Sequence, residues 1–212
     1  RDRGAAMREH YLTDDQKVSY GIGRQLGEQI VDKVFEGLDV GALTAGVADA
    51  LCDEPMPIAE SAMRAAFAAV AQRMEVEQAL QARVQAAEGE AFLEENARRE
   101  EVELTPSGLQ YEVLSAGSGA SPEATGSVLV HYRGTLIDGT VFDSSYERGE
   151  PLAIAVSGAI AGWVEALQMM AEGARWRLYV PPHLAYGEQG SGTAIGPCET
   201  LIFDVELLDI LS

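Results

Sequence analysis

Basic side chains are scarce in this chain of 212 residues. Lys and Arg together number 15 against 34 Asp and Glu, so the formal net charge at pH 7 is −19. Acidic residues outnumber basic ones both before and after residue 104, and neither half offers a basic patch. A phosphate backbone or an anionic membrane surface would repel such a protein, which argues against nucleic acid and membranes as partners.

Cysteine and histidine are also few. The two cysteines, Cys52 and Cys198, lie far apart and lack the spacing of zinc ligands. This excludes a disulfide framework and a zinc site, and it leaves open a single bridge between the two. The three histidines form no HExxH motif, and no serine nucleophile elbow is present. We therefore expect neither a metal ion nor a cofactor.

Long apolar runs are absent as well. No segment reaches the roughly 18 apolar residues that indicate a membrane-spanning helix, so we expect no membrane insertion. The start of the chain, RDRGAAMREHYLTDDQ, lacks the apolar core of a signal peptide. A cytoplasmic location is therefore favoured, with a periplasmic or surface-exposed one if a signal peptide was removed.

Residues 13–53 have the apolar spacing of short helices. Thr13 is a candidate N-cap, because its hydroxyl could accept from a free N–H group of the first turn. Gly37 and Asp39 separate the first helix from a second one. In the first helix, apolar side chains recur every four residues, at Val18, Ile22, Leu26 and Ile30.

Gly23 and Gly27 lie four residues apart in the first helix and therefore share a face. Such a face lets another helix approach closely, although each glycine costs about 1 kcal/mol in a helix interior. The alternative is that both glycines are merely tolerated. The nearby stretch GIGRQLG lacks the spacing and the preceding strand of a dinucleotide-binding motif.

Residues 59–103 predict one long helix. Up to residue 101 this segment has no proline and one glycine, Gly89, and it is rich in Ala, Glu, Gln and Arg. Its apolar stripe is thin, so the helix cannot be the centre of a globular core. We expect an exposed spacer between a helical domain of residues 1–58 and a second domain of residues 104–212.

From Leu104 the sequence becomes strand-like. Alternating segments separated by Gly, Pro and Ser turns are GLQYEVLSAG, SVLVHYRGTL, WRLYVP and ETLIFDVELLDIL. One short helix, AGWVEALQMMAEG, interrupts them and would turn Trp163 and Leu167 toward a sheet. The predicted fold class is α+β, with an antiparallel sheet wrapped around one short helix.

The segment HYRGTLIDGTVFDSSY, residues 131–146, predicts a hairpin whose turn is Asp138 and Gly139. The carboxylate of Asp143 directly follows the large aromatic Phe142. Alternation puts these two side chains on opposite faces of a strand, so a shared site requires a bulge or a bend. The alternative is that Asp143 begins a turn by accepting from the next two N–H groups.

Four segments resemble the FKBP-type peptidyl-prolyl cis-trans isomerases, in order and at the right intervals: VHYRGTLIDGTVFDSS, GAIAGWVEALQMMAEG, LAYGEQGSG and TLIFDVELLDI. The resemblance covers about residues 105–211. The earlier segments SYGIGRQLGEQI, GLDVGALTAGVADAL and FLEENARREEV look like the N-terminal part of the bacterial subfamily of the macrophage infectivity potentiator, Mip. In that subfamily two chains intertwine their N-terminal helices, which implies a homodimer through residues 13–53.

The resemblance also implies a proline-binding pocket in the second domain. Trp163 would form its floor and Asp143 its edge, and the expected catalytic residues are Asp143, Tyr132, Phe142, Trp163, Tyr186 and Phe203. Substrate or inhibitor binding is assigned to Leu152, Ala159, Ile160 and Ile195. The Ile160 backbone N–H and the Tyr186 hydroxyl would face a bound carbonyl.

The implied activity is rotation of Xaa-Pro bonds in proline-containing peptides and unfolded proteins. Macrolide inhibitors such as rapamycin and chaperone activity in the dimer cleft are expected with it. A non-catalytic FKBP-like binding module is the alternative, and a third interpretation makes the N-terminal half the functional chaperone. The chain departs from the commonest family pattern at Leu152, Ala159 and Gly196, which bears on ligand affinity and loop shape rather than on the reaction.

Overall fold

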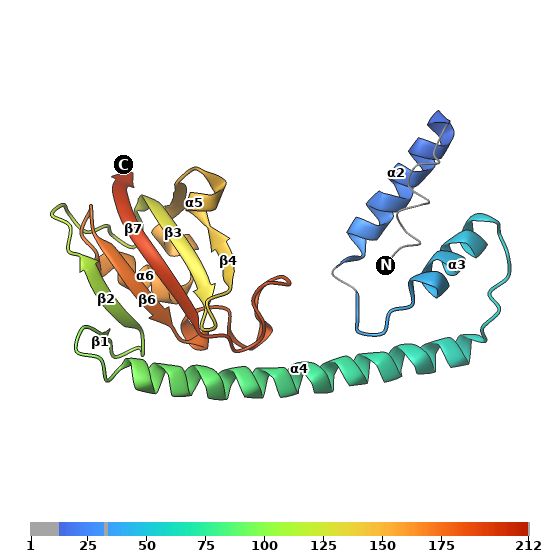
Figure 1. Cartoon of the computed structure of the whole chain (residues 1–212), viewed down its shortest axis with the longest axis horizontal. Coiled ribbons are helices and arrows are strands. Elements are labelled where there is room, and N and C mark those ends of the chain that lie inside the picture. Colours follow the sequence, from blue (N-terminus) through green and yellow to red (C-terminus); the bar gives the residue numbers. More distant parts are fainter. Residues whose placement is uncertain (1–12, 32–33, 212) are drawn as a thin grey trace. The chain divides into compact units, whose positions relative to one another are not determined.

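The computed structural model describes residues 13–31 and 34–211 (Figure 1). The chain forms two compact units that divide between Val70 and Ala71. This division falls inside a long helix, whereas the sequence suggests domain boundaries after residues 58 and 103.

The first unit contains the helices α2 (Asp14–Gln29) and α3 (Val40–Leu51). The Thr13 hydroxyl accepts from the Gln16 N–H, and the Gln16 side chain accepts from the Thr13 N–H, so the expected N-cap is confirmed as a capping box. Asp39 caps α3 in the same way, with its carboxylate accepting from an N–H of the first turn. Among the described residues, neither helix has a buried side chain.

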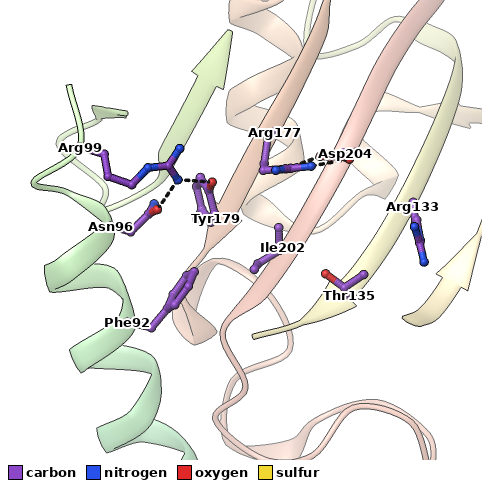
Figure 2. A pocket seen from close by; sticks show the side chains of 9 residues that line it. All are labelled: Phe92, Asn96, Arg99, Arg133, Thr135, Arg177, Tyr179, Ile202 and Asp204. Carbon is purple, nitrogen blue, oxygen red and sulfur yellow. Dashed lines mark hydrogen bonds and ion pairs between the residues drawn. The ribbon is translucent and has the colours of Figure 1, made fainter. Parts of the chain in front are cut away.

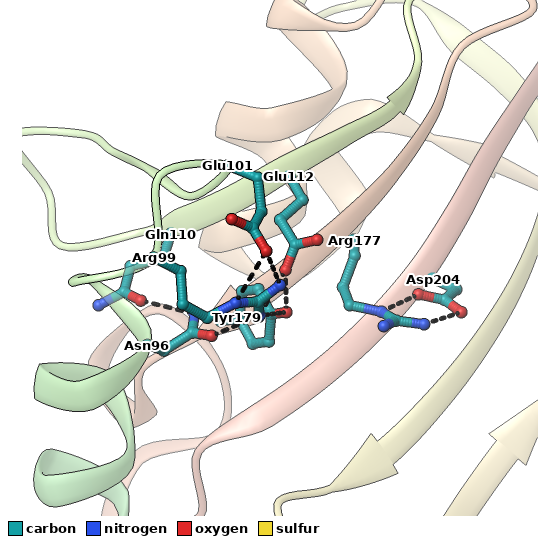
Figure 3. Close-up of polar contacts among 8 residues, drawn as sticks. All are labelled: Asn96, Arg99, Glu101, Gln110, Glu112, Arg177, Tyr179 and Asp204. Carbon is teal, nitrogen blue, oxygen red and sulfur yellow. Dashed lines mark hydrogen bonds and ion pairs between the residues drawn. The ribbon is translucent and has the colours of Figure 1, made fainter.

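The next helix, α4 (Glu60–Asn96), is long and has no break along its length. Its C-terminal end lies earlier than the predicted residue 103, and side chains at this end bond to the sheet. Asn96 is buried and its amide donates to the Gln110 side chain (2.9 Å), and Arg99 donates to the Tyr179 hydroxyl (2.9 Å) (Figure 3). The residues after Asn96 lie outside the helix.

In its described residues the second unit forms a seven-stranded antiparallel sheet. Its strands are β1 (Glu103–Leu104), β2 (Gln110–Ser115), β3 (Ser127–Leu136), β4 (Val141–Ser144), β5 (Leu152–Ala155), β6 (Arg175–Val180) and β7 (Leu201–Leu211). They lie in the order β1-β2-β6-β7-β3-β4, and β5 also pairs with β3. The long strands β3 and β7 are side by side in Figure 1.

The short helix α6 (Ala161–Met169) packs on one face of this sheet. Trp163, Ala166 and Leu167 on α6 are buried, as are alternate residues of the strands, such as Val128 and Val130 on β3. The predicted α+β architecture is confirmed. Both cysteines are free, so the single bridge left open by the sequence is not formed.

Candidate active site

A cavity of about 290 Å³ opens beside α6. Its lining residues come from four strands, from α6 and from the segments before α6 and after β6: Tyr132, Phe142, Asp143, Leu152, Ile154, Gly158, Ala159, Ile160, Trp163, Tyr186 and Phe203. Nine of the ten site residues expected from the sequence are among them. The cavity is mostly apolar, and its volume lies near the lower end of the range of small-ligand sites, about 300 Å³.

Aromatic rings build the bottom of this cavity. The Trp163 ring meets Tyr132 and Phe203 edge-on, with ring centroids 5.2 and 5.3 Å apart. Phe142 meets Phe203 in the same geometry at 5.5 Å. Such edge-to-face pairs are favourable and fix the positions of the rings. Trp163, Tyr132 and Phe203 are only 4–7% exposed, so the bottom of the cavity is part of the core.

Phe142 and Asp143 reach the same cavity because β4 contains a bulge. Gly134 on β3 pairs with Asp143, but the next residue, Thr135, pairs with Val141. Phe142 is thus the extra residue, and the bend required by the sequence is confirmed. Gly134 makes room for it, since a Cβ at this position would lie 2.5 Å from the Phe142 ring.

A polar edge bounds the aromatic bottom. The Tyr132 hydroxyl and the Arg148 guanidinium both donate to the Asp143 carboxylate, and Arg148 also donates to the Tyr132 oxygen (3.0 Å). Burial raises the pKa of Tyr132, the hydrogen bond to Asp143 raises it further, and Arg148 opposes both effects. The turn role considered for Asp143 belongs to Ser144, whose hydroxyl accepts from the Glu147 N–H at the start of α5 (Ser145–Arg148).

Two hydrogen-bond donors remain at the mouth of the cavity. Ile160 precedes the first turn of α6, and in the described part of the chain no backbone hydrogen bond uses its N–H. Tyr186 is 39% exposed, and its hydroxyl has no bonding partner among the described residues. Both donors are available to a carbonyl oxygen of a bound peptide.

Comparison with known proteins identifies the family. Residues 119–208 match the model of the FKBP-type peptidyl-prolyl cis-trans isomerases, and residues 15–113 match that of the domain amino-terminal to such isomerases. The chain is 47% identical over 199 residues to the FKBP-type 22 kDa peptidyl-prolyl cis-trans isomerase of Escherichia coli (strain K12), covering 94% of this chain and 97% of the relative. The chain belongs to the FKBP-type peptidyl-prolyl cis-trans isomerases.

Two further proteins are similar to this FKBP-type isomerase over most of its length. The outer membrane protein MIP of Legionella longbeachae is 38% identical over 93% of this chain and 86% of its own length. The crystal structure of FkpA from Escherichia coli matches with a TM-score of 0.69 at 38% identity, covering 94% of this chain and 98% of that one. Because one relative is named an outer membrane protein, these findings do not support the cytoplasmic preference. Among the described residues, no helix is long and apolar enough to cross a membrane.

One expected site residue of the FKBP-type isomerase lies elsewhere. Ile195 does not line the cavity; its side chain is 7% exposed and belongs to the hydrophobic core. Conversely, sequence reasoning missed Ile154, which shares a face of β5 with Leu152, two residues earlier. It also missed Arg148, because nothing in the sequence shows that α5 places this side chain against the Asp143 carboxylate.

A second hollow of about 320 Å³ lies between the end of α4 and the opposite face of the sheet (Figure 2). Three arginines line it, but two are neutralised by carboxylates. Arg177 bonds to Asp204 through two nitrogens (2.6 and 2.9 Å), and Arg99 pairs with two glutamates. Arg133 alone has no partner among the described residues, so the hollow offers an anion no concentrated positive charge.

Proposed function

We propose that the Trp163 cavity is where this isomerase rotates Xaa-Pro bonds. The amide barrier of about 18–20 kcal/mol arises from resonance, so catalysis needs no bond to be made or broken. In the twisted transition state conjugation is lost and charge separation falls. An apolar site therefore destabilises the planar ground state more than the transition state, and this difference lowers the barrier. The apolar aromatic bottom of the cavity is the observation that carries the proposal.

The polar groups at the edge of the cavity orient the peptide. Asp143 accepts from the Tyr132 hydroxyl and so fixes the ring, and its carboxylate, which is paired with Arg148, faces the twisting amide. The Ile160 N–H and the Tyr186 hydroxyl hold the carbonyl oxygens of the bound peptide. Macrolides such as rapamycin occupy the same apolar volume and compete with the substrate. Leu152 and Ala159 contribute apolar wall.

The protein acts as a homodimer joined through residues 13–53. Apolar side chains of α2 are largely exposed in the single chain, including Val18 (61%), Ile22 (53%) and Leu26 (45%). A Cβ built at Gly23 or Gly27 meets nothing within 4 Å. Contiguous exposed apolar surface favours a partner, and a second copy of the same helices buries it. The cleft of such a dimer gathers unfolded clients, which gives chaperone activity.

The first test is the cis-to-trans rate of an Ala-Xaa-Pro-Phe peptide with the full chain, with and without rapamycin. We expect acceleration that rapamycin abolishes. Acceleration that rapamycin leaves unchanged would contradict the assignment of the macrolide to this cavity. No acceleration by a folded protein would favour a module that only holds its partner.

A further inference from the structure

The C-terminal part of α4 lies directly against the chain that leads into β7. Gly89 on α4 and Thr200 before β7 are both buried. A Cβ at Gly89 would collide with the Thr200 hydroxyl, so only glycine allows this approach without a shift of the Thr200 side chain. The helix thus approaches the chain before β7 with its backbone at this point.

One turn earlier on α4, Gln85 contacts the same chain at two places. Its Nε2 donates to the Glu199 carboxylate at 2.5 Å, and a Cβ at Gly196 would lie 2.8 Å from that nitrogen. Burial raises the pKa of Glu199, as do the charges of Asp138 and Glu88, whereas the hydrogen bond from Gln85 lowers it. Gln85 therefore stabilises a buried carboxylate that its surroundings disfavour.

The segment that Gln85 contacts is hydrogen-bonded to a residue next to the cavity. Cys198, the neighbour of Glu199, donates its backbone N–H to the Gly187 carbonyl at 2.8 Å. Between these two residues the loop is closed by the paired backbone bonds of Ser191 and Ile195 (2.9 and 3.2 Å). Gly187 directly follows Tyr186, which lines the catalytic cavity. The residue next to Glu199 is thus hydrogen-bonded to the residue next to Tyr186.

We infer that Gln85 is a positioning residue of the isomerase, which holds the loop of residues 186–199 through Glu199 and so places the Tyr186 hydroxyl at the cavity mouth. The inference rests on the proposed contact of Tyr186 with the substrate. It makes α4 part of the substrate-binding apparatus, although no residue of this helix lines the cavity. Loss of the contact displaces a substrate-binding group and leaves the aromatic bottom unchanged.

The test uses the full chain and a steady-state assay with a proline peptide. Gln85→Glu opposes Glu199 with a second carboxylate, and Gln85→Ala removes the donor. We expect KM to rise about two- to tenfold in both, the range that one net hydrogen bond supplies, with kcat nearly unchanged. Gln81→Ala is the matched control, because Gln81 is exposed one turn away on the same helix. Its KM should equal that of the wild type.

The double variant Gln85→Glu with Glu199→Gln exchanges donor and acceptor and should restore the wild-type KM. The inference would be overturned if folded Gln85→Glu and Gln85→Ala both kept the wild-type KM. It would also be overturned if the double variant recovered the wild-type thermal midpoint but not the wild-type KM.

A cycle with Tyr186→Phe tests the route of the effect. If Gln85 acts through Tyr186, Gln85→Ala should raise KM much less in the Tyr186→Phe background than in the wild type. Equal effects in both backgrounds would overturn the route. A Tyr186→Phe variant with wild-type kinetics would instead contradict the proposed role of Tyr186, so the two failures are distinguishable.

Discussion

The Tyr132 hydroxyl donates to the Asp143 carboxylate at the rim of an aromatic cavity. The two residues come from neighbouring strands, and Arg148 donates to both from the adjacent α5. The Arg148 guanidinium also lies 5.4 Å from the centre of the Tyr132 ring. The carboxylate that orients the ring is itself half exposed (42%), so its proposed role in the reaction can be tested without removing a core residue.

Asp143→Leu should therefore lower kcat/KM while the domain remains folded. Loss of a hydrogen bond to a charged acceptor corresponds to a decrease of about tenfold or more. The thermal midpoint should fall only modestly, because the exposed ion pair with Arg148 contributes about 0–1 kcal/mol and the Tyr132 hydroxyl, which loses its acceptor, still bonds to Arg148. Asp209→Leu, at an exposed position of β7, is the matched control in the peptide assay. Wild-type activity in a folded Asp143→Leu variant would refute the role of Asp143.

Trp163 is better tested with phenylalanine than with alanine. Its side chain is 5% exposed, and truncation of a buried Trp to Ala costs about 3–5 kcal/mol, a large share of the stability of a typical domain. Trp163→Phe keeps a ring and removes an indole N–H that is buried without a partner among the described residues. We expect kcat/KM to fall severalfold at a nearly unchanged thermal midpoint. Unaltered kcat/KM would contradict Trp163 as the floor for proline.

The Tyr132 pKa predicts behaviour at high pH. Burial and the hydrogen bond to Asp143 raise it above the ordinary value of 10.0, so the folded protein keeps a proton that the unfolded chain loses. The stability contributed by Tyr132 is then fully present below pH 10 and is lost as pH rises through the folded pKa. Ultraviolet titration of tyrosinate, wild type against Tyr132→Phe, measures this pKa. Arg148→Gln should raise it further, and a midpoint at or below the ordinary value would contradict the assignment.

The strands were predictable because their signals are local. β3 (Ser127–Leu136) coincides with the alternating segment SVLVHYRGTL, and Asp138 and Gly139 form the expected turn before β4, where Gly139 has φ +87°. The bulge at Phe142 followed from alternation together with the shared pocket that the resemblance implies. Most wall residues came with the family resemblance rather than from periodicity.

The docking of α4 could not be predicted, because most of its contacts are polar or small and a single aromatic one, Phe92 with Tyr179, makes no stripe. Gln85, Gly89 and Asn96 give no apolar stripe, so the sequence suggested an exposed spacer. Their partners lie far along the chain, as with the Gln85 contact to Glu199. Ile195 is not among the residues that line the cavity, and an apolar residue in a loop gives no sign of whether it lines a cavity.

The position of the domain boundary is testable with two fragments. Residues 71–212 keep the part of α4 that covers Gln110 and Thr200, whereas residues 104–212 expose both and remove the donor of Glu199. We expect the longer fragment to retain the peptide activity of the full chain and to unfold at a higher temperature than the shorter one. Equal thermal midpoints and activities would place the boundary at residue 103, as the sequence suggests. Acceleration of protein refolding should fall in both, since both lack residues 13–53.

A substitution at Gly23 tests whether α2 packs against the same helix of a second copy or stands alone. In a solitary helix, Gly23→Ala should stabilise by about 1 kcal/mol through helix propensity. In a dimer whose helices meet at this face, the added methyl separates them and weakens association. Gly21→Ala is the matched control: a Cβ at Gly21 also meets nothing within 4 Å, and Gly21 lies on the opposite face of α2 from Gly23. Sedimentation equilibrium should show a dimer for wild type and Gly21→Ala and a weakened dimer for Gly23→Ala. Equal association in all three would contradict close packing at the glycine face.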